Sequence, residues 1–275
     1  MRAAVLEARE SMAVREIDEP ALRPGHVRVA PKAVGICGTD LHVYLGTMEH
    51  RVPYPAVLGH EFAGEVVEAA ADVEAAGAKA FVRPADLADP RVCDSVVADA
   101  ERALGTPDIL LYAAAINLRA PAEEVQLEQV HRTFEVNAAS AFAMAQAIGR
   151  RLIAAGKPGS LIFIASLMSR GARPTTIPYG ISKMALGGIV RGLATEWARH
   201  GIRANAIAPG YVRTEMTRPL YTDPEFHSWV LSRTPLGRWQ EPEDYAPIAV
   251  FLASEASAVI TGQIIYADGG WTAAL

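Results

Sequence analysis

From Ala78 onward the sequence alternates short apolar runs with long amphipathic stretches. The apolar runs are AKAFVRP, DILLYAAAI, SLIFIAS, IRANAIAPG and GQIIYADGG, and each has the length and composition of a β-strand. The stretches between them have helical periodicity and cover residues 90–104, 127–155, 178–200 and 243–254. This order predicts an α/β fold, a doubly wound parallel sheet with helices on both faces. Ligand chemistry should then gather where the strands end.

The first 65 residues have a different pattern. Short alternating segments such as HVRVAPKAV are interrupted by Gly and Pro, which predicts small antiparallel β-structure. The junction EFAGEVVEAAADVEAAG fits either a strand through FAGEVV or a helix that ends at Gly77. Its second half is rich in Ala and Glu, which favours a helix from about Glu65 onward. We therefore expect two domains, a β-rich segment over 1–65 and the α/β domain over 66–275.

Composition and charge exclude several classes of protein. Hydrophobic residues make up 51% of the chain and charged residues 21%, which is enough apolar material for a folded core. The formal net charge of -5 gives no broad basic surface, so nucleic acids and anionic membranes are not expected partners. No apolar run reaches the roughly 18 residues that span a bilayer, and MRAAVLEARE is unlike a secretory leader. We expect a cytoplasmic protein in which Cys37 and Cys93 are free thiols.

Tyr179 and Lys183 are the first candidates for chemistry. They lie four residues apart in the helix predicted over 178–200, so their side chains project from one face. A phenol has a pKa of about 10, and a nearby ammonium group stabilises the phenolate. Lowering that pKa by about three units takes roughly 4 kcal/mol, which is reached only in a desolvated cleft. The alternative is that both are ordinary residues of a helix.

Two polar residues precede this pair in the chain. Ser166 ends the run SLIFIAS, where a hydroxyl can hydrogen-bond a substrate carbonyl and the alkoxide formed from it. A serine in that place can also simply close a strand into a turn. Asn137 lies inside the helix predicted over 127–155, where Asn is mildly unfavourable and more often faces solvent than the core.

The order Asn137, Ser166, Tyr179 and Lys183, followed by IRANAIAPGYVRT and ITGQIIYADGG, resembles the short-chain dehydrogenase/reductase family over residues 66–271. The resemblance implies a Rossmann-like oxidoreductase that moves hydride between NAD or NADP and a small secondary alcohol or ketone. It also implies assembly into a homodimer or homotetramer. By resemblance, Tyr179 is the general acid/base, and Lys183 lowers its pKa and holds the nicotinamide ribose. Ser166 orients the carbonyl, and Asn137 supports a water relay.

The same resemblance implies a set of cofactor contacts. One group faces the adenine ring, one approaches the cofactor through its backbone, and one lies on the nicotinamide side. The matching residues are Asp86 and Leu87, then Ala113 and Ala114, and then Pro209, Gly210, Val212 and Thr214. Each also fits a structural role, such as a capping Asp, a core Val or a loop-forming Pro and Gly.

Two features depart from this family. Its Asn-Asn-Ala-Gly turn is replaced by Tyr112, Ala113, Ala114 and Ala115, and Tyr is much bulkier than Asn. No TGxxxGxG motif occurs anywhere in the chain, so the family's first βαβ unit has no counterpart. That unit supplies the backbone amides and the helix N-terminus that hold a pyrophosphate. We therefore predict a Rossmann-like sheet truncated on its amino-terminal side, with weakened cofactor binding.

Residues 1–73 resemble the start of the medium-chain, zinc-dependent alcohol dehydrogenases, from MRAAVLEARE through VGICGTDLHVY to LGHEFAGEVVE. This resemblance implies a partial GroES-like β segment and makes the chain a chimera. In some members a Cys and the His and Glu of a GHE triplet bind catalytic zinc, and the matching residues are Cys37, His60 and Glu61. The rest of that domain, with its structural cysteines and its own GxGxxG, is missing. A buried Cys and a surface His and Glu are therefore the favoured interpretation.

Three functions stay open at this point. The first is a nicotinamide-dependent oxidoreductase with Tyr179 as acid/base. The second is a non-catalytic remnant that keeps the oligomer-forming helices over 127–155 and 178–200. The third is zinc-dependent chemistry at the amino-terminal segment. Cofactor titration, light scattering and metal analysis would separate them.

Overall fold

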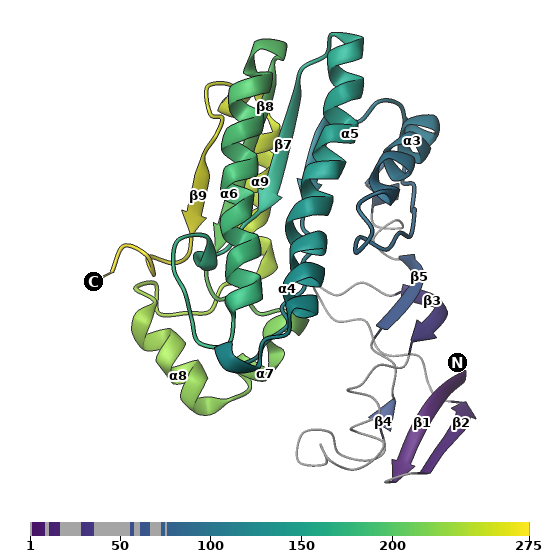
Figure 1. Cartoon of the computed structure of the whole chain (residues 1–275), viewed down its shortest axis with the longest axis vertical. Coiled ribbons are helices and arrows are strands. Elements are labelled where there is room, and N and C mark those ends of the chain that lie inside the picture. The colour runs from purple at the N-terminus through teal and green to yellow at the C-terminus, as the bar shows by residue number, and fades with distance from the viewer. Residues whose placement is uncertain are drawn as a thin grey trace. The chain divides into compact units, whose positions relative to one another are not determined.

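A computed structural model of the chain describes residues 2–8, 11–16, 29–35, 56–57, 61–66, 73–74 and 76–274 (Figure 1). The chain divides into two compact units, Met1–Ala85 and Asp86–Leu275. Within the described part of the chain, none of the helices combines the length and the apolar character that crossing a membrane requires.

The first unit contains short antiparallel strands. A hairpin joins β1 (Arg2–Ala8) to β2 (Ser11–Glu16), and β4 (Ala56–Val57) pairs with the other edge of β1. A second pair joins β3 (Val29–Gly35) to β5 (Glu61–Val66). The antiparallel β-structure predicted for this part of the sequence is therefore confirmed.

Two predictions near the junction are wrong. A helix was expected to begin at about Glu65, but β5 continues as a strand through Val66 because β3 supplies hydrogen-bond partners along its length. Of the later residues of that predicted helix, 67–72 lie outside the described residues and 73–74 are helical. The segment AKAFVRP was expected to be a strand, but residues 78–84 contain no strand. An apolar run becomes a strand only when a neighbouring strand satisfies its backbone groups.

The second unit is built on a four-stranded parallel sheet. Its strands are β6 (Ile109–Tyr112), β7 (Gly159–Ile164), β8 (Ile202–Pro209) and β9 (Ile264–Ala267), in the order β6-β7-β8-β9. All three pairings are parallel, so the carboxyl ends of the four strands lie at the same edge of the sheet. The parallel α/β sheet predicted from the alternation is confirmed.

Helices connect these strands at nearly the predicted positions. Short 3-10 turns occupy 122–124, 167–169, 198–200, 215–217, 242–245 and 255–257. The α-helices are α3 (Val92–Leu104), α4 (Leu127–Phe134), α5 (Ser140–Ala155), α6 (Ile177–Trp197), α7 (Arg218–Tyr221), α8 (Pro224–Arg233) and α9 (Ala246–Ala253). A π-helical turn (Glu135–Ala139) joins α4 to α5, so the helix predicted over 127–155 is continuous but locally widened.

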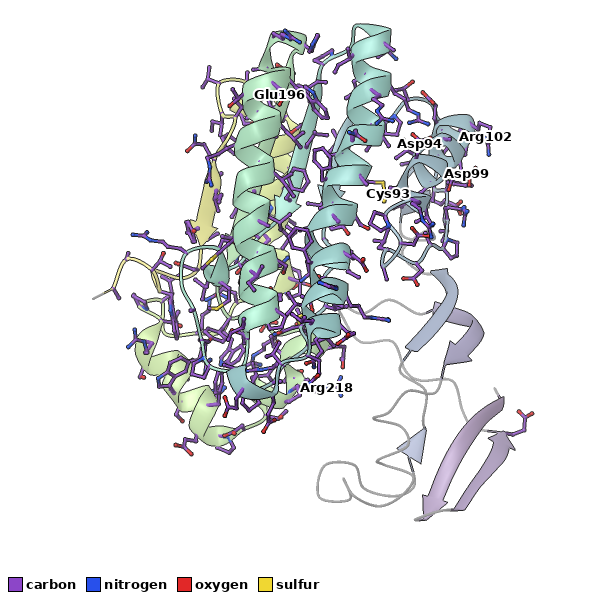
Figure 2. All side chains as sticks on the ribbon, viewed as in Figure 1. Cys93, Asp94, Asp99, Arg102, Glu196 and Arg218 are labelled. Atoms are coloured by element: carbon purple, nitrogen blue, oxygen red, sulfur yellow. The ribbon has the colours of Figure 1, made fainter. Side chains whose placement is uncertain are left out.

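The core lies on both faces of the sheet. Alternate side chains of β7 point to opposite faces, so Leu161 and Phe163 pack with α5 and α6, whereas Ile162 packs with Leu252 of α9. In Figure 1 the strands accordingly lie between the pair α5 and α6 and the helix α9. On the outer side of α5, the Sγ atom of Cys93 on α3 lies 3.6 Å from the carbonyl oxygen of Ser140 (Figure 2). Cys93 is a free thiol, as predicted.

Candidate active site

The structure brings Ser166, Tyr179 and Lys183 together. Ser166 lies just beyond β7, and α6 begins two residues before Tyr179, with Pro178 fitting the first turn, where no amide donor is needed. The Ser166 hydroxyl lies near enough to the Tyr179 phenol to lower its pKa. The Nζ atom of Lys183 lies 5.5 Å from the centroid of the Tyr179 ring. A phenol, an alcohol and an amine thus share one site at the carboxyl edge of the sheet.

Burial controls the protonation of this group. Lys183 is only 2% exposed, and burial lowers the pKa of its amine to about 8. Its Nζ atom donates to the carbonyl oxygen of Ile164 at 2.6 Å. Burial raises the pKa of Tyr179, and the nearby Ser166 hydroxyl only partly opposes this rise. The phenol is therefore protonated at neutral pH.

Burial and Ser166 account for the pKa of Tyr179 in this structure, and the lowering of that pKa by Lys183 stays a prediction. The amine is directed at the Ile164 carbonyl rather than at the phenol oxygen, and it is itself destabilised in its charged form by burial. A protonated phenol is nevertheless the form that can donate a proton to a ketone oxygen.

Asn137 sits in the π-helical turn and is fully buried, so the expectation that it faces solvent is wrong. Its Oδ1 atom accepts from the amide of Ile116 at 2.8 Å, and its Nδ2 atom donates to the Ile116 carbonyl at 2.9 Å. The Nδ2 atom also donates to the Ser182 hydroxyl at 2.9 Å. These partners remove the cost of burying the amide, and the widened turn is a common feature of functional sites.

Ser182 was not identified from the sequence, although it joins Asn137 to the reacting tyrosine. Its hydroxyl donates to the backbone carbonyl of Tyr179 at 2.7 Å. One hydrogen-bonded network therefore runs from the main chain of Ile116 through the side chains of Asn137 and Ser182 to the first turn of α6. A serine inside a predicted helix carries no distinctive pattern, so only the fold could identify it.

The adenine-side candidates begin the second unit. The Oδ1 atom of Asp86 accepts from the amide of Ala88 at 2.9 Å, which closes an Asx turn and does not cap a helix, because α3 begins only at Val92. Leu87 is partly buried against the core, and its carbonyl accepts from the Ser140 hydroxyl at 2.7 Å. Both residues are therefore held by local hydrogen bonds next to α5.

Tyr112 fits into the core despite its bulk. It is 5% exposed, and its hydroxyl donates to the carbonyl of Val136, the residue before Asn137. Burial raises the pKa of this phenol well above its usual range. Ala113 and Ala114 follow directly after β6, at the same edge of the sheet as Ser166. The Tyr112 hydroxyl therefore ties the end of β6 to the π-helical turn.

The nicotinamide-side candidates follow β8. Pro209 is the last residue of this strand, and Val212 forms a parallel bridge with Gln240. Thr214 caps the short helix at 215–217. A Cβ atom on Gly210 would lie 2.4 Å from the Oε1 atom of Gln240 and 3.0 Å from the backbone of Asp268. Only glycine allows the chain to pass so close to the end of β9.

The predicted zinc ligands cannot be assembled from the described residues. Cys37 and His60 lie outside them, and for Glu61 the structure describes only the backbone, as the first residue of β5. Within residues 2–8, 11–16, 29–35, 56–57, 61–66, 73–74 and 76–274, no group of three or more His, Cys, Asp or Glu side chains could hold a metal ion.

Comparisons with known proteins agree with this architecture. A family model described as enoyl-(acyl carrier protein) reductase matches residues 56–272. Gluconate 5-dehydrogenase of Gluconobacter oxydans (strain 621H) is 39% identical over 219 residues, which cover 80% of this chain and 85% of that protein. The chain belongs to the short-chain dehydrogenase/reductase family. Another relative, 5-keto-D-gluconate 5-reductase of Escherichia coli (strain K12), is 36% identical over 199 residues, 72% of this chain and 78% of that protein.

Solved structures of this dehydrogenase/reductase family have the same fold. A gluconate 5-dehydrogenase from Burkholderia cenocepacia J2315, crystallised with NADP and tartrate, has a TM-score of 0.73 and 37% identity. The likeness covers 76% of this chain and 82% of that one. A 4-hydroxyisoleucine dehydrogenase complexed with NADH has a TM-score of 0.67 and 29% identity over 70% of this chain and 79% of that one. The protein is therefore a dehydrogenase/reductase that uses NAD or NADP, and the non-catalytic alternative is not supported.

Proposed function

We propose that this dehydrogenase/reductase interconverts a secondary hydroxyl and a ketone on a small sugar acid of the gluconate class. The observation that carries the proposal is the grouping of Ser166 and Tyr179 beside the buried amine of Lys183. The names of the relatives narrow the substrate, because gluconate 5-dehydrogenase and 5-keto-D-gluconate 5-reductase both act at a secondary carbon of such an acid. Tartrate, bound by the relative from Burkholderia cenocepacia, is also a hydroxy acid.

Tyr179 is the proton donor when the ketone is reduced. The pKa of its phenol is raised by burial, so it carries its proton at neutral pH and can pass it to the developing alkoxide. The Ser166 hydroxyl, which lies beside the phenol, hydrogen-bonds the same substrate oxygen and fixes its position. In the opposite direction the phenolate removes the proton from the substrate hydroxyl. Asn137 positions Tyr179 through Ser182, and its support of a water relay stays a prediction.

Lys183 is suited to hold a nicotinamide ribose. An ammonium group has three N–H donors, and Lys183 donates one of them to Ile164, so two can bind ribose hydroxyls. The remaining contacts fall to Asp86 and Leu87, to the backbone of Ala113 and Ala114, and to Pro209, Gly210, Val212 and Thr214. When bound, the nicotinamide ring supplies or accepts the hydride.

The test uses the full chain. Fluorescence titration with NADH and NADPH measures cofactor binding, and absorbance at the nicotinamide band measures oxidation of D-gluconate and reduction of 5-keto-D-gluconate. We expect turnover in wild type and a loss of about a hundred- to ten-thousandfold in kcat for Tyr179→Phe. Tyr266→Phe, which removes a half-buried phenol from β9, is the matched control and should retain activity. Absence of cofactor binding at millimolar concentration would remove the proposal.

We also propose that the chain is a chimera whose first domain, 1–65, derives from a zinc-dependent alcohol dehydrogenase. The GHE triplet and its flanking sequence support a partial GroES-like segment, and the lack of TGxxxGxG supports a truncated start for the second domain, 66–275. Zinc at Cys37, His60 and Glu61 is the less favoured part of this proposal. Elemental analysis of the purified protein, with Cys37→Ser as comparison, tests it: one equivalent of zinc that the variant loses would establish the site.

A homodimer or homotetramer is the proposed assembly. Large apolar side chains are exposed along the long helices of the second unit, among them Phe142 on α5 and Ile181 and Met184 on α6. Exposed apolar surface of this kind marks protein–protein contact. Light scattering on the purified chain tests the assembly, and a monomer at micromolar concentration would contradict it.

A further inference from the structure

An aromatic cluster surrounds Tyr211, the residue that follows Gly210 after β8. Its ring centroid lies 5.8 Å from that of Phe226, 6.1 Å from Trp229, 5.5 Å from Trp239 and 4.9 Å from Trp271. Phe226 and Trp229 belong to α8, whereas Trp271 follows β9. Three rings of α8 and the segment after it, together with Trp271, are therefore packed around one phenol.

Arg173 is built into this cluster. Its guanidinium carbon lies 4.5 Å from the centroid of the Phe226 ring and 4.5 Å from that of the Trp229 ring. One of its nitrogens donates to the Tyr211 hydroxyl. Aromatic faces attract a guanidinium group and hold its plane in a fixed orientation. The positive charge is thus pre-positioned among rings.

Two more arginines act on the same phenol. Arg119 donates to the Thr175 hydroxyl at 3.2 and 3.3 Å, and the guanidinium carbon of Arg233 lies 5.4 Å from the centroid of the Trp271 ring. Burial and the positive charge of Arg173 both lower the pKa of Arg119, so the two guanidinium groups repel each other. Burial raises the pKa of Tyr211, and the charges of Arg173, Arg119 and Arg233 all oppose this rise.

None of these three arginines has an acidic partner among the described residues. The ion pairs within that part of the chain involve other arginines: Arg91, Arg102, Arg151, Arg213, Arg218 and Arg238 each pair with an Asp or Glu. Arg173 and Arg119 instead bond only neutral hydroxyl oxygens. Repelling positive charges held together without an acid form a site for an anion.

The arginine cluster is attached to the reacting groups through short pieces of backbone. The amide and hydroxyl of Thr176, the residue just before α6, both donate to the carbonyl of Arg173. Arg119 lies three residues beyond Ile116, which Asn137 holds through two hydrogen bonds. Tyr211 follows β8 at the carboxyl edge of the sheet, the edge at which Ser166 follows β7.

We propose that Arg173, assisted by Arg119 and the Tyr211 hydroxyl, binds the carboxylate of the substrate. The inference rests on the proposed sugar-acid function and names the group that selects an acid over a neutral polyol. A guanidinium group presents two parallel N–H donors, which match the two oxygens of a carboxylate. The aromatic rings keep Arg173 in place before the substrate arrives, so little side-chain freedom is lost on binding.

The test compares KM values for D-gluconate and for a neutral polyol of similar size, D-glucitol. Arg173→Met should raise KM for D-gluconate about ten- to hundredfold, because a charge-assisted hydrogen bond to the acid is lost. The variant should leave the NADPH affinity unchanged, and kcat/KM for D-glucitol should not fall. Arg119→Met should raise the same KM by a smaller factor, because Arg119 only assists Arg173. Arg150→Met, an exposed arginine of α5, removes the same charge elsewhere and should change neither value.

The result separates the two proposals. If wild type binds no NADPH and oxidises no sugar acid, the proposed function is wrong. If wild type oxidises D-gluconate and both Arg173→Met and Arg119→Met keep the wild-type KM, the carboxylate subsite is wrong and the proposed function stands. Inhibition by tartrate supplies a second measurement. Its Ki should rise in Arg173→Lys, which keeps the charge but loses the paired donors, and an unchanged Ki would also contradict the subsite.

Discussion

β7 and β6 are neighbours in one parallel sheet, yet their surroundings differ. Both faces of β7 are covered, since Leu161 and Phe163 are fully buried on one face and Ile162 is 1% exposed on the other. On β6, Ile109 and Leu111 are 49% and 50% exposed. The strand that leads to Ser166 is thus supported by a complete core, whereas the strand that leads to Ala113 and Ala114 is supported on one face. Ser166, for which we propose a catalytic role, thus follows the better-supported strand.

The largest expected effect tests this difference directly. Phe163→Ala removes a fully buried ring from β7 and should cost about 3 to 5 kcal/mol of unfolding free energy. Leu111→Ala on β6 removes a side chain that is half exposed and should cost less than about 1 kcal/mol. Urea denaturation of both variants measures the two values. Equal losses would show that β6 is as well packed as β7.

The loop after β6 is held in place by hydrogen bonds from the side chain of Asn137 and not by an apolar core. Asn137→Ala leaves the amide and carbonyl of Ile116 without their partner and should cost about 2 to 3 kcal/mol, because each buried unpaired group carries its desolvation penalty. Urea denaturation measures this loss, and steady-state kinetics should show a lower kcat. Asn117→Ala in the same loop is the matched control, since the Oδ1 atom of Asn117 has no hydrogen-bond partner. A loss as large in Asn117→Ala would contradict the special role of Asn137.

The Tyr112 hydroxyl also stabilises β6, and its loss should cost less unfolding free energy than the loss of the Asn137 side chain. Tyr112→Phe removes its hydrogen bond to Val136 and should cost about 1 to 2 kcal/mol at pH 8. Burial raises the pKa of Tyr112 in the folded state. Above about pH 10 the unfolded phenol ionises while the folded one does not, so this stabilisation declines as the pH rises. Denaturation at pH 8 and pH 10.5 should therefore show the gap between wild type and variant narrowing, and a constant gap would contradict the raised pKa.

The smallest effect concerns α9, which covers the second face of β7. Asp244 caps the turn before α9, and hydrogen bonds from Arg238 and from the Glu241 amide lower its pKa to about 2. Asp244→Asn should cost about 1 kcal/mol or less at pH 7. The contribution is present above about pH 4 and is lost as the pH falls through 2. Melting curves at pH 7 and pH 3 check this, and Glu128→Gln, an exposed charge on α4, should change neither curve.

Part of the candidate site could be predicted because it depends on local spacing. Tyr179 and Lys183 lie four residues apart, so they share a helix face whatever surrounds them. Ser166 directly follows an apolar run, and that run forms β7. The direction of the Tyr179 pKa could not be predicted in the same way. It depends on how deeply the phenol is buried and on where Nζ of Lys183 points, and Nζ points to the carbonyl of Ile164.

The sequence by itself determined the alternation of strands and helices, the parallel order of the sheet in the second unit and the spacing of the reacting side chains. These properties follow from backbone periodicity, which acts over a few residues. Only the tertiary structure decided that AKAFVRP is not a strand, that Asn137 is buried against Ile116, and that Arg173 bonds Tyr211, which is 38 residues away in the chain. Each of these depends on which distant segment supplies the hydrogen-bond partner or excludes water, and no local pattern records that choice.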